Sequence, residues 1–266
     1  GLNSRAFRKR GGIPWAPSSE DDKAAKESHR AMTAAEIEAI VDAFGLAAKR
    51  AQEAQFDAIQ LHAAHSYMFS QFLSPCSNKR TDRWGGDLES RMRFHLQVVE
   101  TIRKAVGRDY PLFIKLGVQD TVSGGLSLDE GCLVAQKLSL AGIDAIEVSE
   151  GLEEAGANHI RKDVNSQEKE AYYAPWARQV KASVDVPVIL VGGLRSYHVM
   201  ENIVQEGGAD LVSMCRPFIR EPDIVKRWQG KDQEPAKCIS CNLCLRKIIQ
   251  EEPLECVQEN LKKREE

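Results

Sequence analysis

The chain has 266 residues, of which 42% are hydrophobic and 28% are charged, so it is long enough to bury the core of a globular domain. Its formal net charge of -3 gives no electrostatic reason to expect a nucleic acid or an anionic membrane as partner, because both attract basic patches. No apolar run approaches the roughly 20 residues that span a bilayer, and the first residues lack the apolar core of a signal peptide. These features favour a cytoplasmic protein that acts on a small molecule, and they leave a homo-oligomer open.

The first 31 residues carry no periodic pattern and are predicted to form a loop or connector. They start without Met in a basic stretch, Arg5 to Arg10, which we interpret as an internal starting point of a longer protein. A helix is predicted next, because Thr33 and Glu36 form a capping box and apolar residues then recur at helical spacing to about Gln55.

Short apolar runs and helical patterns alternate along the rest of the chain as far as residue 230. Five apolar runs are typical of buried strands, at residues 56–61, 112–116, 145–148, 186–191 and 211–214. Helical patterns separate them at residues 88–106, 128–141, 173–183 and 197–205. Repeated strand-helix units predict an α/β fold with a parallel sheet. Periodicity does not distinguish an open, doubly wound sheet from a closed eight-stranded barrel, since both bury their strands on two faces.

The chemically suggestive residues come directly after predicted strands, and active sites of parallel α/β folds lie at that carboxyl edge. They are His62, His65 and Tyr67 after the first strand, Gly192 and Gly193 after the fourth, and Cys215 and Arg216 after the fifth.

The spacing of His62 and His65 lets two imidazoles hold one acceptor if the loop between them coils. Two nitrogen donors aimed at a carbonyl oxygen would polarise it, and the Tyr67 phenol could then deliver a proton to a neighbouring carbon. A metal site is disfavoured because no nearby carboxylate completes it. A purely structural role for the two histidines remains the alternative.

The residues around this pair resemble the signature region of Old Yellow Enzyme-type ene-reductases and the related 2,4-dienoyl-CoA reductases. The resemblance rests on QLHAAHSYMFSQFLSP, ending at Pro75, and on SNKRTDRWGGDLESRMRF, ending at Phe94. It extends more weakly from Pro14 to Pro222. It implies a TIM (β/α)8 barrel with FMN, which passes hydride from NAD(P)H through flavin N5 to an α,β-unsaturated alkene. The barrel is thereby favoured over the open sheet.

The resemblance also implies roles for single residues. His62 and His65 would hold the activating oxygen of the substrate, Tyr67 would donate the proton, and Lys115 would stand beside flavin N1 and O2, where Arg is usual. Ser66 replaces the usual glycine, which matters if the backbone there needs a positive φ. The FMN phosphate is expected at Gly192, Gly193, Cys215 and Arg216.

Only five of the eight barrel strands are recognisable, so we expect an N-terminally truncated, partial barrel over residues 32–230. Its unpaired edges should lie near Ile59 and Leu211, and part of the flavin contacts should be missing. A non-catalytic partial barrel that cannot hold FMN is therefore one alternative. A demethylase or aromatic-compound reductase of the same superfamily is another.

The tail from residue 231 to 266 carries a second motif. Two-residue gaps separate Cys238, Cys241 and Cys244, and Cys256 follows after eleven more residues. The pattern resembles the iron-sulfur stretch of dienoyl-CoA reductases, which has one more residue between its second and third cysteines. A [4Fe-4S] cluster, a zinc ion and ordinary thiols are the three interpretations that the spacing leaves open.

Overall fold

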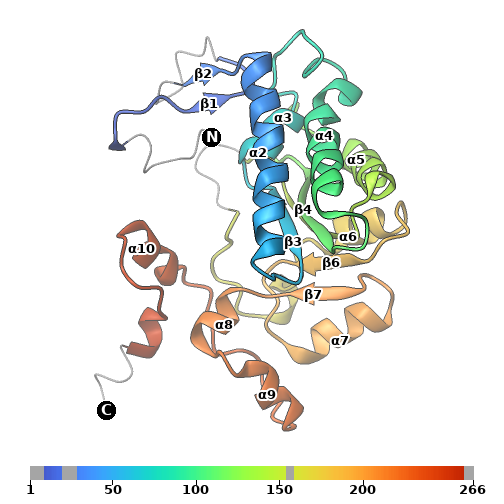
Figure 1. Ribbon diagram of the computed structural model, residues 1–266. Helices are drawn as coiled ribbons and strands as arrows, with labels where there is room; N and C mark the ends of the chain where they lie inside the picture. Colours follow the sequence, from blue (N-terminus) through green and yellow to red (C-terminus); the bar gives the residue numbers. More distant parts are fainter. Residues whose placement is uncertain (1–8, 20–28, 154–158, 261–266) are drawn as a thin grey trace. The chain divides into compact units, whose positions relative to one another are not determined.

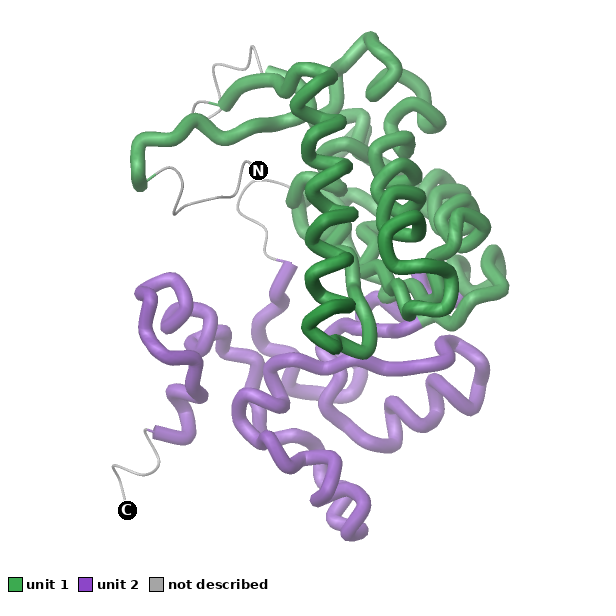
Figure 2. The backbone as a smooth tube through the Cα atoms, viewed as in Figure 1, with its two compact units in different colours: residues 1–157, 179–188 green, residues 158–178, 189–266 purple. Residues whose placement is uncertain are grey.

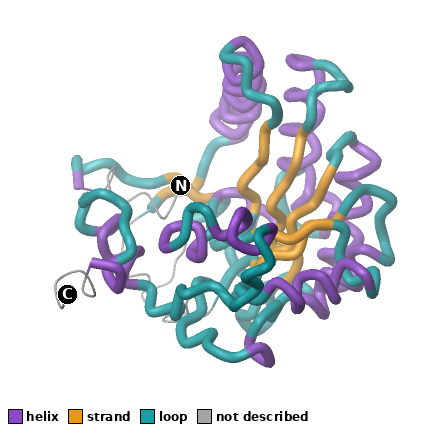
Figure 3. The backbone as a smooth tube through the Cα atoms, turned by 90° about the horizontal axis from the view of Figure 1, so that it is seen from below, coloured by secondary structure: helices purple, strands orange, loops and turns teal. Residues whose placement is uncertain are grey.

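The computed structural model describes residues 9–19, 29–153 and 159–260. Its main sheet has the strand order β3-β4-β5-β6-β7, and Figure 3 draws the strands in orange. The β3–β4, β4–β5 and β6–β7 pairs are parallel. The strands are β3 (Ile59–Ala63), β4 (Leu112–Gln119), β5 (Ala145–Glu150), β6 (Val188–Val191) and β7 (Leu211–Ser213).

Helices separate the strands as expected (Figure 1). The predicted ones are α2 (Ala34–Glu53), α4 (Leu88–Val106), α5 (Leu128–Ala141), α6 (Ala174–Lys181) and α7 (Tyr197–Gln205). Short elements that the sequence did not predict are α3 (Met68–Leu73), η1 (Gln167–Lys169), α8 (Arg216–Arg220), α9 (Ile224–Gln229) and α10 (Leu243–Ile249). None of the helices in the described residues is long and apolar enough to cross a membrane.

Two details differ from the sequence prediction. The first strand of the main sheet starts at Ile59 rather than Phe56, whose side chain is exposed. The predicted connector contains two short strands, β1 (Trp15–Ala16) and β2 (Arg30–Ala31), which pair in parallel. This pair forms a separate sheet and does not extend the five-stranded one.

The chain divides into two compact units, coloured separately in Figure 2. Unit 1 comprises residues 1–157 and 179–188, and unit 2 comprises residues 158–178 and 189–266. In unit 1, α2 and α4 lie side by side (Figure 1), and α5 packs against β4. A Cβ at Gly131 of α5 would lie 1.8 Å from the carbonyl oxygen of Val118, so this close approach requires glycine.

The strand register sorts the side chains of β3, β4 and β5 onto two faces. Leu61, Ile114 and Ile146 form one row, and all three are buried. The next row along, offset by one residue, is His62, Lys115 and Glu147, and it points to the opposite face because side chains alternate along a strand. One face is therefore an apolar core, and the other carries polar chemistry.

The five-stranded sheet confirms the predicted α/β fold, and its strand number is the one expected of a partial (β/α)8 barrel. β3 and β7 stand at the two ends of the sheet, so within the described residues they have one unpaired edge each, as expected near Ile59 and Leu211.

Candidate active site

The structure brings the three predicted catalytic side chains of unit 1 together. The imidazole of His62 lies 5.1 Å, centroid to centroid, from the imidazole of His65 and equally far from the phenol ring of Tyr67. His62 is exposed at the end of β3, and Tyr67 is 45% exposed where α3 begins. The cluster is therefore accessible from solvent.

The backbone of the loop after β3 holds these rings in place. His65 and Ser66 both adopt φ of 58°, a left-handed conformation that only glycine takes readily. Their N–H groups donate to the carbonyl oxygens of Glu150 and Gly151 at distances of 2.9 and 3.0 Å. The loop thus reaches the end of β5, and the positive φ at Ser66 explains why glycine is usual there in the family that the sequence resembles.

Ser149, at the end of β5, is a site residue that sequence reasoning missed. Its hydroxyl is fully buried, and a hydrogen bond of 2.8 Å links it to Nε2 of His65. The partner of one ring nitrogen sets the tautomer and orientation of a histidine, so Ser149 orients His65. The sequence could have indicated Ser149, because this residue lies at the carboxyl end of a predicted strand.

Lys115 is held by a network that spans three strands. Its Nζ donates to Glu147 Oε1 at 2.7 Å, and Gln60 Nε2 donates to Glu147 Oε2 at 2.8 Å. Both oxygens of the buried Glu147 carboxylate are therefore satisfied, which a buried charge requires. The network keeps a cation on the same face, and in the same row, as His62.

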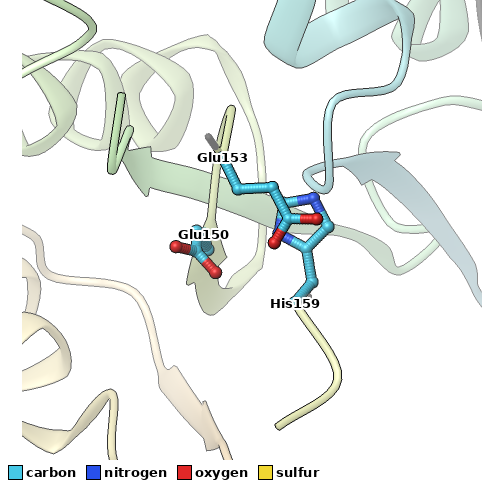
Figure 4. A group of neighbouring side chains, drawn as sticks. All are labelled: Glu150, Glu153 and His159. Carbon is cyan, nitrogen blue, oxygen red and sulfur yellow. The ribbon is translucent and has the colours of Figure 1, made fainter. Parts of the chain in front are cut away.

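An acidic pair lies at the end of β5 in unit 1. Figure 4 labels its two side chains, Glu150, the last residue of β5, and Glu153. Carboxylate oxygens of Glu150 and Glu153 lie within 4.8 Å of each other. The pair places negative charge beside the strand end to which the His65 loop is bonded.

The glycine pair after β6 has the backbone of a tight turn. Gly192 has φ of 136° and Gly193 has φ of 71°, and Cβ atoms there would lie 3.1 and 2.9 Å from the ring of Tyr172. The guanidinium of Arg161 stacks over the same ring at 4.2 Å. Side chains are thus disfavoured at both glycines, as a turn that presents its backbone to an anion requires.

Arg216 points to a neighbour that the sequence did not reveal. Its Nη1 donates to Asn242 Oδ1 at 2.6 Å and to the carbonyl oxygen of Arg161 at 2.8 Å. Asn242 lies between the second and third cysteines of the tail. Cys215 precedes α8 and is exposed. Phosphate binding by the two glycines, Cys215 and Arg216 stays a prediction.

All four tail cysteines line one cavity of about 20 Å³ in unit 2. Each is a free, half-buried thiol. Burial raises the pKa of the Cys244 thiol above its usual range, and the neighbouring Cys238 and Cys241 act in the same direction, against Arg216. The cavity exceeds the roughly 10–15 Å³ that one water needs. Four thiols that line one small space are the kind of donor set that an iron-sulfur cluster or a zinc ion uses.

The family model described as "NADH:flavin oxidoreductase / NADH oxidase family" matches residues 5–234 of the chain. Among similar proteins, an NADH oxidase of Thermoanaerobacter brockii is 39% identical over 231 residues, which cover 86% of this chain and 35% of that protein. A metal reductase of Desulforamulus reducens is 36% identical over 244 residues, which cover 91% of this chain and 36% of that protein. The chain thus spans about a third of the length of these two relatives.

Two solved structures have similar folds. A 2-naphthoyl-CoA reductase in complex with 2-naphthoyl-CoA gives a TM-score of 0.82 at 28% identity, over 92% of this chain and 37% of that one. Histamine dehydrogenase from Rhizobium sp. 4-9 gives a TM-score of 0.83 at 28% identity, over 97% of this chain and 37% of that chain. With a family model that matches most of its length, the chain belongs to the NADH:flavin oxidoreductase / NADH oxidase family.

Proposed function

We propose that the protein carries the substrate site of an NAD(P)H-dependent, FMN-assisted reductase of α,β-unsaturated carbonyl compounds. The convergence of His62, His65 and Tyr67 on one accessible face, one strand away from Lys115, carries this proposal. FMN, when bound, supplies the two-electron carrier between NAD(P)H and substrate.

The residues of unit 1 have separate roles in substrate binding and proton transfer. His62 and His65 hold the carbonyl oxygen and stabilise the negative charge that develops on it, while Ser149 keeps the His65 ring in position. The accessible Tyr67 phenol, in ring contact with His62, delivers the proton to the substrate carbon.

Lys115 would hold the pyrimidine edge of the flavin, and Glu147 fixes its ammonium at the strand face. Positive charge there stabilises the anionic reduced flavin. We place the phosphate at the glycine turn, as the resemblance implies, and the positive φ values there suit backbone donation to an anion.

Flavin titration tests the proposal directly. Quenching of FMN fluorescence should show saturable binding to the chain, weaker in Lys115→Met and unchanged in Lys104→Met, which alters an exposed lysine of the same unit. His62→Ala and His65→Ala should instead weaken binding of phenolic or enone ligands to the flavin-loaded protein. Absence of FMN binding by the unmodified chain would support the alternative, a non-catalytic partial barrel.

A second candidate is reduction of an aromatic acyl-CoA, favoured by the similarity to the 2-naphthoyl-CoA reductase. Both candidates use the same cofactor and differ in substrate. Steady-state rates with a simple enone and with an aromatic CoA thioester distinguish them.

For the tail, we propose a [4Fe-4S] cluster held by Cys238, Cys241, Cys244 and Cys256. Their common cavity supports it, and none of the four is in a disulfide within the described residues. Anaerobically prepared protein should contain iron and acid-labile sulfide, and Cys241→Ser should lose both, whereas Cys132→Ser in unit 1 should retain them. Zinc without sulfide would assign a structural zinc site instead.

A further inference from the structure

We propose that Arg220 is the electrostatic partner of the metal centre in the cysteine cavity and that its charge raises the reduction potential of that centre. This inference rests on the cluster proposed above and concerns how the protein controls it.

Two cations of α8 border the cavity. Arg216 and Arg220 stand four residues apart, on one face of the helix, and both line the cavity with the four cysteines. The Arg220 side chain is only 5% exposed. A buried guanidinium is costly unless negative charge and hydrogen-bond acceptors surround it.

Arg220 lacks a full set of such partners among the described residues. Its Nη1 donates to the carbonyl oxygen of Lys237 at 2.6 Å. Its buried Nε makes no hydrogen bond, and the nearest ion-pair oxygen, Oε2 of Glu259, is 3.6 Å away. A buried guanidinium with an incomplete set of acceptors at the wall of a cysteine cavity is suited to face an anionic occupant.

Arg216 has a different role from Arg220. Its Nη1 bonds to Asn242 and to the Arg161 carbonyl, which ties α8 to the cysteine loop. Arg220 bonds instead to the carbonyl oxygen of Lys237, directly before the first cysteine, and its guanidinium lines the cavity itself.

The chemistry of a four-thiolate iron-sulfur centre gives this charge a consequence. Such a centre gains one negative charge when it accepts one electron, and net charge and hydrogen bonds around it set its potential. A buried guanidinium favours the more negative, reduced state. Zinc, which has no redox chemistry, would show no such effect.

A potentiometric titration of the anaerobically prepared full chain tests the inference, with dithionite as the electron donor and visible absorbance as the readout. In Arg220→Gln the ratio of reduced to oxidised centre at a fixed potential should fall about tenfold, which corresponds to about 59 mV for one electron. Arg220→Lys keeps the charge and should lie closer to the unmodified protein. Lys226→Gln removes the same charge from an exposed site in unit 2 and should cause no shift.

Glu259→Gln provides a variant that should not disturb folding, because Glu259 is 42% exposed. It removes the anion beside Arg220 and should raise the potential. Unaltered potentials in both Arg220→Gln and Glu259→Gln would overturn the role of Arg220 while leaving the cluster in place. An unmodified chain that binds no iron or sulfide would overturn the cluster proposal and this inference with it.

Discussion

Two neighbouring residues of the loop after β3 have a strained backbone conformation. His65 and Ser66 are consecutive non-glycine residues with positive φ, a conformation that costs roughly 1–2 kcal/mol per residue. Hydrogen bonds from their N–H groups to β5, and from Gln71 Nε2 to the Ser66 carbonyl at 2.6 Å, hold them there. The strain keeps His65 against Ser149.

Ser66→Gly should therefore stabilise the protein. Glycine removes the left-handed penalty but loses more entropy on folding, so we expect a net gain of about 0.5–1 kcal/mol in the free energy of unfolding. Urea unfolding measures it. Ser139→Gly, inside α5, is the control and should destabilise by a similar amount. A loss of stability in Ser66→Gly would mean that the Ser66 side chain contributes more than its backbone costs.

Tyr67→Phe should separate the two half-reactions of the flavin-loaded protein. Only substrate reduction needs the phenolic proton, so its rate should fall roughly 100- to 10,000-fold while flavin reduction by NAD(P)H stays intact. Stopped-flow absorbance follows each half-reaction. Equal losses in both, or none in either, would remove Tyr67 from the proton-donor role.

At the scale of single elements, α4 combines a capped start with an unusual buried face. Asp87 caps the helix by accepting from the Ser90 N–H at 2.8 Å. The inner face buries apolar side chains such as Phe94 and Val98, but it also buries His95. Both ring nitrogens of His95 lack a hydrogen-bond partner among the described residues, and Phe69 packs at 4.9 Å from the ring. The helix therefore contains one neutral, poorly satisfied imidazole.

Burial lowers the pKa of His95 from 6.5 to about 3, which makes stability depend on pH. Above pH 6.5 the His95 imidazole is neutral in both the folded and the unfolded protein, so its burial causes no pH-dependent loss of stability. Below it the unfolded chain binds a proton that the folded protein excludes, so stability falls by about 1.4 kcal/mol per pH unit until the folded pKa is reached. His95→Leu should remove this contribution. Urea unfolding of both proteins at about pH 7 and pH 5 measures it; identical pH slopes would contradict it.

At the scale of the whole molecule, unit 2 has an apolar groove of about 530 Å³. Its apolar lining comes from α7, β7, α8 and α9 and consists of Met200, Val204, Val212, Met214, Phe218, Val225 and Trp228. The end strand β7 contributes to it, and Leu211 on that strand is 52% exposed. An apolar groove beside a strand whose outer edge is unpaired, as far as the described residues show, favours association.

The chain should accordingly self-associate through unit 2 at high concentration. Leu211→Lys and Val225→Glu should shift it toward monomer, because each places a charge on an exposed apolar position. Sedimentation velocity measures the distribution of monomers and oligomers. Leu140→Glu, an exposed apolar residue of α5 in unit 1, is the matched control and should leave association unchanged. If all three variants behave alike, the groove is not the associating surface.

Local sequence signals predicted the main elements. The capping box at Thr33 forms as expected, and five strands and five helices lie close to their predicted positions. The short helices were not predicted, since α3 and α8, with six and five residues, contain too few turns to show a period. The spacing of His62, His65 and Tyr67 was enough to predict their cluster, because all three lie within six consecutive residues.

Tertiary structure decided which residues support that cluster. Ser149 is 84 positions from His65, and Glu147 is 87 from Gln60. The link from Arg216 to the cysteine loop likewise joins residues far apart in sequence. Such pairs depend on strand register, and a shift of one residue would turn every side chain to the other face. The sequence by itself therefore determined the elements and the chemistry at their ends. The folded chain determined the partners, because only packing fixes which strand ends meet.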